Sequence, residues 1–155
     1  MIPNDRMQDF CHECANGDQD AAAFLLTIAR ITRLADDFAD GEPHLSAVAD
    51  MSDLLLSALV YLPNNAFYQR HQQAFSGVFV TTVLSWAKSE DWRYREPEKT
   101  RMFAFVMREA TDQIAWLTAF ITGGQEHAMC IADKLHEIAH LEGNFETFGD
   151  WEKET

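Results

Sequence analysis

Apolar residues recur every three or four positions along almost all of this chain, and this spacing constrains its fold most. The clearest seam consists of Phe24, Ile28, Ile31, Ala35 and Phe38. Steps of three and four place side chains on one face of an α-helix, whereas a half-buried strand alternates in steps of two. Only 7 glycines and 4 prolines punctuate 155 residues, which favours a few long elements over many short strands. The sequence therefore predicts an all-α fold.

Start and stop signals divide the chain into six predicted helices. Asn16-Gly17, Pro63 and Gly123-Gly124 are the stop signals, and Pro97 is a favoured first-turn residue. The predicted helices cover residues 4–15, 18–40, 46–62, 64 to at least 86, 97–122 and 125–140. We expect one domain over residues 1–155, a bundle of four long and two shorter helices, with residues 141–155 as a loosely held tail.

One segment of the fourth predicted helix has a competing interpretation. Residues 78–83 are rich in β-branched side chains, which favours a strand locally. The helical spacing continues on both sides of this segment, so we predict that it is helical as well.

Net charge limits the partners that the chain is expected to bind. The formal charge is −13, which repels phosphate backbones and anionic lipid surfaces, so neither nucleic acid nor membrane is an expected partner. No apolar run approaches the ~18 residues that span a bilayer, and the first residues lack the pattern of a secretory signal. Together with an odd number of cysteines, three, this predicts reduced thiols and a cytoplasmic location.

Carboxylates gather at the end of the second predicted helix. Asp36, Asp37 and Asp40 form a D-D-x-x-D motif in which Asp36 and Asp40 share one side. Asp36 continues the line of Ala29 and Thr32, so it borders the buried face. Adjacent aspartates with a third one turn later suit a hard cation such as Mg²⁺. The alternative is a solvated acidic helix end.

The fifth predicted helix carries an acid in an unexpected place. Glu109 interrupts an apolar line that includes Phe105 and Trp116, and Asp112 lies one turn later at its edge. A carboxylate among aromatic side chains is unfavourable unless it is paired, protonated or bound to a metal. The alternative to a functional acid is a buried ion pair with an arginine such as Arg70 or Arg108.

Acids on two facing helices suggest metal–phosphate chemistry, in which a metal neutralises phosphate oxygens and orients a water. The predicted function is divalent-metal-dependent hydrolysis of a small phosphorylated or diphosphate compound. The residues predicted to bind Mg²⁺ or Mn²⁺ are Asp36, Asp37, Asp40, Glu109 and Asp112. His71 and Glu109 are the predicted catalytic groups, and Arg33, Arg70 and Arg108 are predicted to contact phosphate.

Parts of the chain resemble known families. D-D-x-x-D resembles the first metal motif of helical isoprenoid diphosphate synthases, and residues 109–112 are similar to the E-x-x-D of all-α nucleotide pyrophosphatases. More broadly, Gly-Asp, D-D-x-x-D-Gly, Asn-x-Phe-Tyr with His71, and Gly123-Gly124 with His127 resemble a set of small, uncharacterised all-helical phage and prophage proteins. That resemblance implies no particular activity.

Two further motifs bear ligands that zinc prefers. His136, Glu137 and His140 form H-E-x-x-H, and Glu146 follows at the position of a third ligand, so a zinc site is an alternative. We predict that it is not a catalytic zinc site, because no sheet is expected that would hold a peptide. Cys11, Cys14, His127 and Cys130 offer a Cys₃His set, although burial in the core is the favoured interpretation.

A non-catalytic function is the other alternative. The excess of acids suits a helical protein that binds a basic protein partner. The expected partners are thus a small phosphorylated molecule or a protein, and the question of a homo-oligomer stays open.

Overall fold

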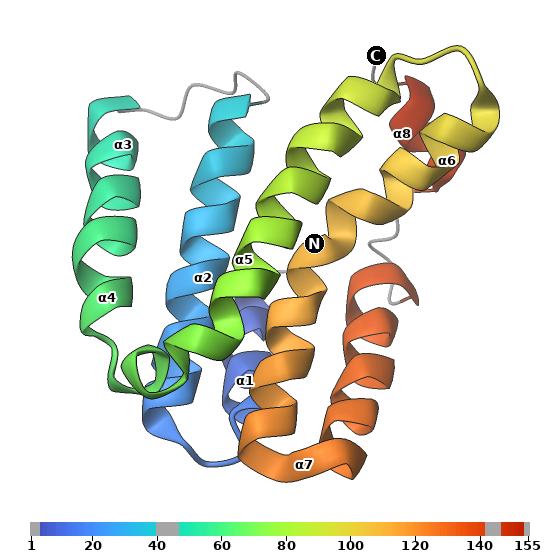
Figure 1. Cartoon of the computed structure of the whole chain (residues 1–155). Helices are drawn as coiled ribbons and strands as arrows, with labels where there is room; N and C mark the ends of the chain where they lie inside the picture. Colours follow the sequence, from blue (N-terminus) through green and yellow to red (C-terminus); the bar gives the residue numbers. More distant parts are fainter. Residues whose placement is uncertain (1–3, 40–46, 142–146, 154–155) are drawn as a thin grey trace.

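The computed structural model describes residues 4–39, 47–141 and 147–153, and every regular element among them is a helix (Figure 1). The predicted all-α fold is confirmed. The segment with a competing strand interpretation, residues 78–83, lies inside a continuous helix. None of the helices in the described parts is long and apolar enough to cross a membrane.

Eight α-helical segments follow one another along the chain. They are α1 (Asn4–Cys14), α2 (Gln19–Ala39), α3 (Ala47–Leu56), α4 (Leu62–Asn64), α5 (Ala66–Arg93), α6 (Glu98–Met107), α7 (Asp112–His136) and α8 (Phe148–Lys153). Three short turns of other helical types continue them, namely π-helices η1 (Ser57–Tyr61) and η3 (Glu137–Leu141) and the 3₁₀-helix η2 (Arg108–Thr111).

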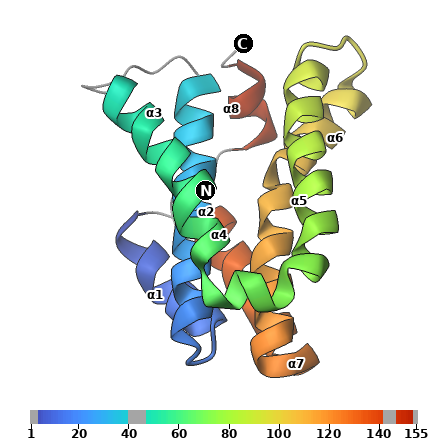
Figure 2. The same cartoon turned by 60° about the vertical axis from the view of Figure 1, so that its left-hand side comes forward.

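Helix α2 occupies the middle of the bundle. It contacts α1, α3, α5 and α7, and α5 in turn packs against α6 and α7 (Figures 1 and 2). Helix α3 therefore lies at one margin of the molecule. Apart from the turn η1 that continues it, its main neighbour is α2. This position matters for the surface of α3 considered below.

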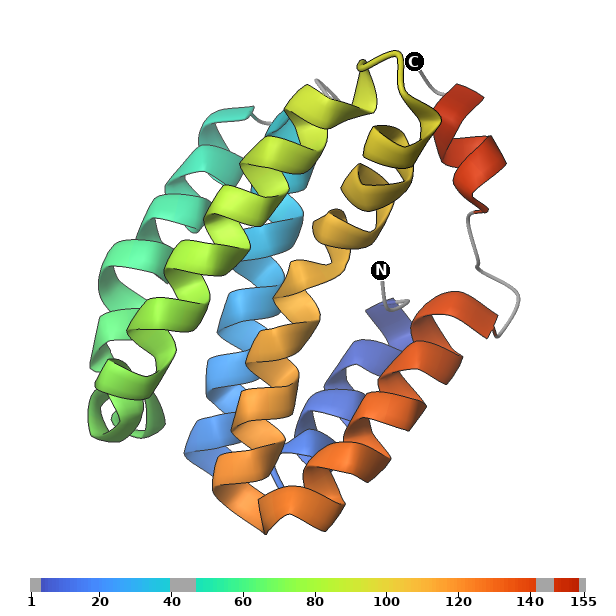
Figure 3. The ribbon, with the colours of Figure 1, turned by 45° about the vertical axis from the view of Figure 1, so that its right-hand side comes forward.

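Helix α7 reverses direction within one element. Gly124 has φ 79° and ψ −171°, a conformation that is essentially reserved for glycine, and it separates two helical halves. The second half returns beside α1 (Figure 3). The stop predicted at Gly123-Gly124 is therefore confirmed, and it makes a helical hairpin out of residues 112–136.

Aromatic side chains from α2 and α5 form the densest part of the core. Phe24 is fully buried, and its ring centroid lies 4.7 Å from that of Phe75 and 5.5 Å from that of Phe67. Both phenylalanines project from α5 at helical spacing, which is why the apolar periodicity of the sequence translated directly into packing.

The C-terminal segment differs from the sequence-based expectation. Residues 148–153 form α8, and the indole of Trp151 is only 1% exposed. It packs against Phe105 and Phe148, with centroid distances of 5.5 and 6.2 Å. The expectation of a loosely held tail is thus wrong for residues 147–153, because one large aromatic side chain anchors a short, polar-looking helix.

Candidate functional site

A cavity of about 400 Å³ lies between α2, α5 and the start of α7, with α1 and η3 at its base. Most of its wall is apolar, including Leu25, Ile28, Trp86, Ile114 and Leu135. Its volume is within the range of small-molecule sites, which are apolar clefts with a few placed polar groups. The cavity is therefore the natural candidate for a binding site.

Acidic groups from four elements line the same cavity. Asp36 comes from the end of α2, Glu90 from α5, and Glu109 and Asp112 from η2 and the start of α7. Among the described residues that line the cavity, Arg108 is the one cation. Three of the five predicted metal ligands thus come to one cavity from segments about seventy residues apart.

The 3₁₀ turn η2 determines which residues of this region face the cavity. A 3₁₀-helix advances by about 120° per residue instead of 100°, so four residues turn the following helix by roughly 80°. Phe103, which would share a face with Ala110 and Ile114 in a regular α-helix, is consequently 54% exposed, whereas Ala110 and Ile114 are buried. The hydroxyl of Thr82 donates a hydrogen bond to the carbonyl oxygen of Ala110 at 3.3 Å, which ties η2 to α5 beside Glu109.

The carboxyl group of Asp112 has a strongly raised pKa. Burial, followed by the negative charge of the nearby Glu109, raises its pKa to about 7. Both causes disfavour the charged form of the acid. Asp112 can therefore take up or release a proton near neutral pH, as a general acid or base requires.

Arg108 connects the cavity with α8. Its guanidinium carbon lies 5.8 Å from the ring centroid of Trp151, within the range of a cation–π contact. Arg93 approaches the same indole at 4.8 Å, and its Nη2 donates to the carbonyl oxygen of Trp151 at 3.1 Å. The short helix α8 thereby contributes to the position of the one cationic side chain that lines the cavity.

Several predicted site residues lie elsewhere. Asp37 and Arg33 belong to α2 but do not line the cavity, because neighbouring positions on a helix point in different directions. Asp40 lies outside the described residues. The predicted metal ligation by Asp37 and the predicted phosphate contact of Arg33 therefore stay predictions that the lining of this cavity does not support.

Arg70 and His71 are separated from the cavity along the axis of α5. The cavity-lining residue of α5 nearest to them is Thr82, and eleven residues of helix measure about 16 Å. Arg70 pairs with Asp18 and Asp20 at 3.4 and 3.5 Å, at the start of α2. The ring of His71 instead packs on Phe67, with a centroid distance of 4.8 Å. The predicted roles of these two residues in the cavity are therefore corrected.

The carboxylates lining the cavity do not form a complete metal cage. No three His, Cys, Asp or Glu side chains of the described residues are grouped closely enough to hold one ion. Glu109 and Asp112 lie near enough for their charges to interact. Mg²⁺ ordinarily uses only one or two carboxylates, completed by water and substrate phosphates, so this pair fits such a partial site.

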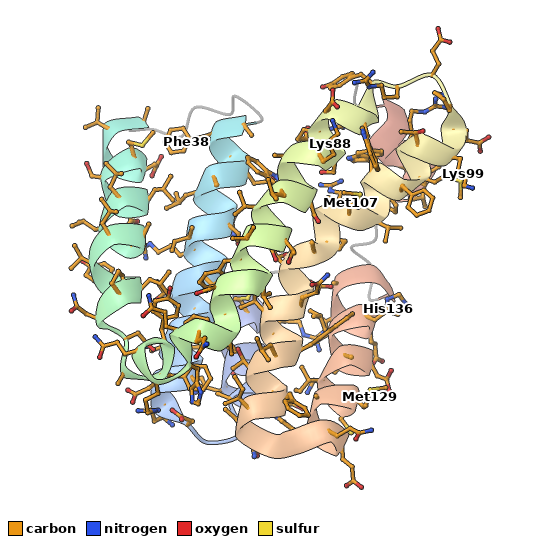
Figure 4. All side chains as sticks on the ribbon, viewed as in Figure 1. Phe38, Lys88, Lys99, Met107, Met129 and His136 are labelled. Carbon is orange, nitrogen blue, oxygen red and sulfur yellow. The ribbon has the colours of Figure 1, made fainter. Side chains whose placement is uncertain are left out.

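The H-E-x-x-H motif lies on the outer side of the second half of α7. His136 and Glu137 are exposed, and Figure 4 shows His136 pointing away from the bundle. The helix changes to the π-helix η3 at Glu137, which widens the turn and disturbs the stacking of residues four apart. The side chain of His140 and all of Glu146 lie outside what the structure describes, so the prediction that no catalytic zinc binds here stays a prediction.

The three cysteines differ in burial. Cys11 and Cys14 are buried, and burial raises the pKa of each thiol to about 12, whereas Cys130 is exposed. The Nε2 of His127 lies 3.1 Å from the carbonyl oxygen of Cys14, to which it donates. The favoured interpretation of Cys11 and Cys14 as core residues is confirmed.

Glu90 is a cavity residue that sequence reasoning missed. It continues the line of Phe79, Val83 and Trp86 on α5, at steps of four, three and four, so it has the same signal that singled out Glu109.

Comparison with family models, curated proteins and solved structures finds no match. The candidate site therefore rests on its geometry and chemistry alone.

Proposed function

We propose that the cavity binds a small phosphorylated molecule together with a divalent cation, and that the protein hydrolyses this molecule. The observation that carries the proposal is the gathering of Asp36, Glu90, Glu109 and Asp112 around one cavity with a single arginine. Four acids would repel an anionic phosphate, whereas a Mg²⁺ or Mn²⁺ ion between acid and phosphate makes their charges complementary.

Each polar group has a distinct task in this proposal. Glu109 and Asp112 supply the two carboxylates of the cation, and Arg108 contacts a phosphate oxygen. Water attacks phosphorus, the bond from phosphorus to the leaving oxygen breaks, and one water proton passes to a carboxylate. Glu90 or Asp36 accepts that proton when the cation holds Asp112 in its charged form. The apolar wall accommodates the organic part of the molecule.

The apolar wall favours a second candidate function. A ligand with an apolar body and a protonated amine would also match a cavity that has several acids and no three-ligand metal group among its described residues. In this case the protein is a binding protein for an organic cation, and no metal is required.

Metal titration of the stripped protein separates the two candidates. For the hydrolase we expect Mn²⁺ or Mg²⁺ to raise the melting temperature, because an ion that binds only the folded state stabilises it. Glu109→Gln should abolish this rise, whereas Asp133→Asn, an exposed acid of α7, should preserve it. Release of inorganic phosphate or pyrophosphate from a panel of nucleotides and diphosphates should depend on the same ion. A melting temperature that responds to no divalent cation contradicts the hydrolase, and stabilisation by alkylamines would then support the second candidate.

Glu109→Gln in the metal-free protein gives a further discrimination. If Glu109 is one of several repelling acids, the substitution should raise the free energy of unfolding, because it removes a partly buried like charge. If Glu109 instead forms a structural pair with Arg108, the same substitution should lower it, because a partly buried cation loses its counter-ion. Urea denaturation in the presence of a chelator measures the sign.

A further inference from the structure

Helix α3 and the turn η1 expose an unusual amount of apolar surface. No residue of α3 is buried, and Ser57 is the one buried residue of η1. The large apolar side chains of this segment that are more than a third exposed are Val48, Met51, Leu55, Leu56, Leu59, Val60 and Tyr61. A soluble helix normally turns such residues toward a core. Although α3 packs against α2, the described parts of the chain leave these side chains uncovered.

Four of these residues follow one another along the segment. Val48, Met51 and Leu55 are spaced by three and four residues in α3, Leu59 follows in the wider π-helical turn η1, and we call these four the α3 seam. They are 78, 42, 49 and 69% exposed. Steps of three and four are the spacing with which two helices pack along their lengths. The α3 seam therefore has the form of a helix-pairing surface.

The exposed area is large enough for an interface. Seven partly exposed side chains of this size leave roughly 400–600 Å² of apolar surface accessible to water. Burial of such surface contributes ~25 cal/mol per Å². That area equals the largest patch of a typical monomer and is concentrated on one helix. With its polar rim it approaches the ~800 Å² per partner of a stable interface.

The charges around the seam indicate what kind of partner covers it. Residues 47–61 contain no lysine or arginine, and their two acids are Asp50 and Asp53. Asp53 accepts a hydrogen bond from Nε of Arg30 at 2.8 Å, so its charge is paired within the chain. A lipid surface would select a basic polar face beside the apolar one, and a strongly basic protein would select unpaired acids. A second copy of this chain needs neither.

We propose that the α3 seam packs against the same seam of a second copy of this chain in a twofold, antiparallel helix pair. Such an interface is self-complementary, so one apolar line suffices for both partners. The antiparallel direction separates the two Asp50 carboxylates, which a parallel pair would bring together. This inference does not depend on the chemistry of the cavity.

Sedimentation and light scattering over a range of concentrations test the proposal. We expect a species of twice the monomer mass of 17.7 kDa. Leu59→Asp should raise the dimer dissociation constant by more than about 100-fold, because the pair would bury two charges without partners. Val106→Asp is the matched control, since Val106 on α6 is also 69% exposed but lies outside the seam. It should leave the dimer intact.

Cross-linking provides a second measurement that does not rely on a disruptive variant. In a Cys130→Ser background, which removes the exposed native thiol, Leu55→Cys should form a disulfide between two chains under mild oxidation. Val106→Cys in the same background should not. A wild-type protein that stays monomeric at every concentration overturns the proposal. Sedimentation of this monomer with lipid vesicles would assign the seam to a membrane instead.

Discussion

Asp112 lies one turn after Glu109, and burial together with the charge of Glu109 raises the pKa of Asp112 to about 7. Glu109 lies within the 3₁₀ turn η2, Asp112 is the first residue of α7, and both line the cavity. This pair makes the cavity a pH-dependent feature of the fold, whatever ligand it binds.

The raised pKa of Asp112 predicts how stability depends on pH. The ordinary aspartate pKa is 3.8, so between about pH 4 and 7 the folded protein binds a proton that the unfolded chain has lost. The contribution of Asp112 to stability is therefore full below pH 4 and falls as the pH rises through 7, by roughly 2–4 kcal/mol.

Asp112→Asn isolates this contribution from those of the other acids. We expect the variant to unfold at higher urea concentration than the wild type at pH 8 and at a similar concentration at pH 4. Asp133→Asn, which replaces an exposed acid of α7, should follow the wild type at both values. Identical pH profiles for wild type and Asp112→Asn would show that Asp112 titrates normally.

The anchoring of α8 by Trp151 predicts a large loss of stability. Trp151→Ala should lower the free energy of unfolding by about 3–5 kcal/mol, because it removes a buried indole that contacts Phe105 and Phe148. Trp116→Ala is the control for tryptophan content, since Trp116 is 43% exposed. Trp116→Ala should lower the free energy of unfolding by less than about 1 kcal/mol. Chemical denaturation of both variants at one pH compares them directly, and equal losses would contradict the assigned position of α8.

Two glycines are predicted to respond to alanine in opposite directions. Gly124→Ala should destabilise the protein by about 1–3 kcal/mol, because φ 79° with ψ −171° is unfavourable for any L side chain. Gly77 lies within α5, and a Cβ there would meet nothing within 4 Å. Gly77→Ala should therefore stabilise by about 0.5–1 kcal/mol through helix propensity. Thermal melting gives both signs, and a stabilising Gly124→Ala would show that α7 does not reverse at that residue.

The three cysteines should differ in reactivity toward a thiol reagent. Cys130 is exposed, whereas burial raises the pKa of Cys11 and Cys14 to about 12 and keeps them protonated. At pH 8 we expect one fast-reacting thiol in the folded protein and three after denaturation. Cys130→Ser should abolish the fast phase. A fast phase that persists in Cys130→Ser would place Cys11 or Cys14 at the surface.

The helices and the association of distant acids were predictable because both depend on periodicity. Asp36 and Glu109 each extend or interrupt an apolar line, and side chains on such lines meet in a bundle core. Glu90 likewise extends an apolar line, that of α5. Periodicity does not give the level of a residue along the bundle, however, and His71 lies about three helical turns away from the cavity to which its spacing assigns it.

Two other features had no signal in the pattern of the sequence. The turn η2 contains neither glycine nor proline, yet it rotates the buried face between Phe103 and Ala110. The burial of Trp151 depends on Phe105 of α6, Arg93 of α5 and Arg108 of η2. Both are tertiary effects that local propensity does not encode.

The reversal at Gly124 also has a consequence for folding during synthesis. It brings the second half of α7 back to α1, where Lys134 pairs with Glu13 across 121 residues of chain. At ~5–20 residues per second, the ribosome needs about 6–24 s to make that partner after α1. Until then Phe10 and Cys14, both buried in the finished protein, lack one side of their packing. The nascent chain therefore exposes this face of α1 until the second half of α7 has been made and can pack against it.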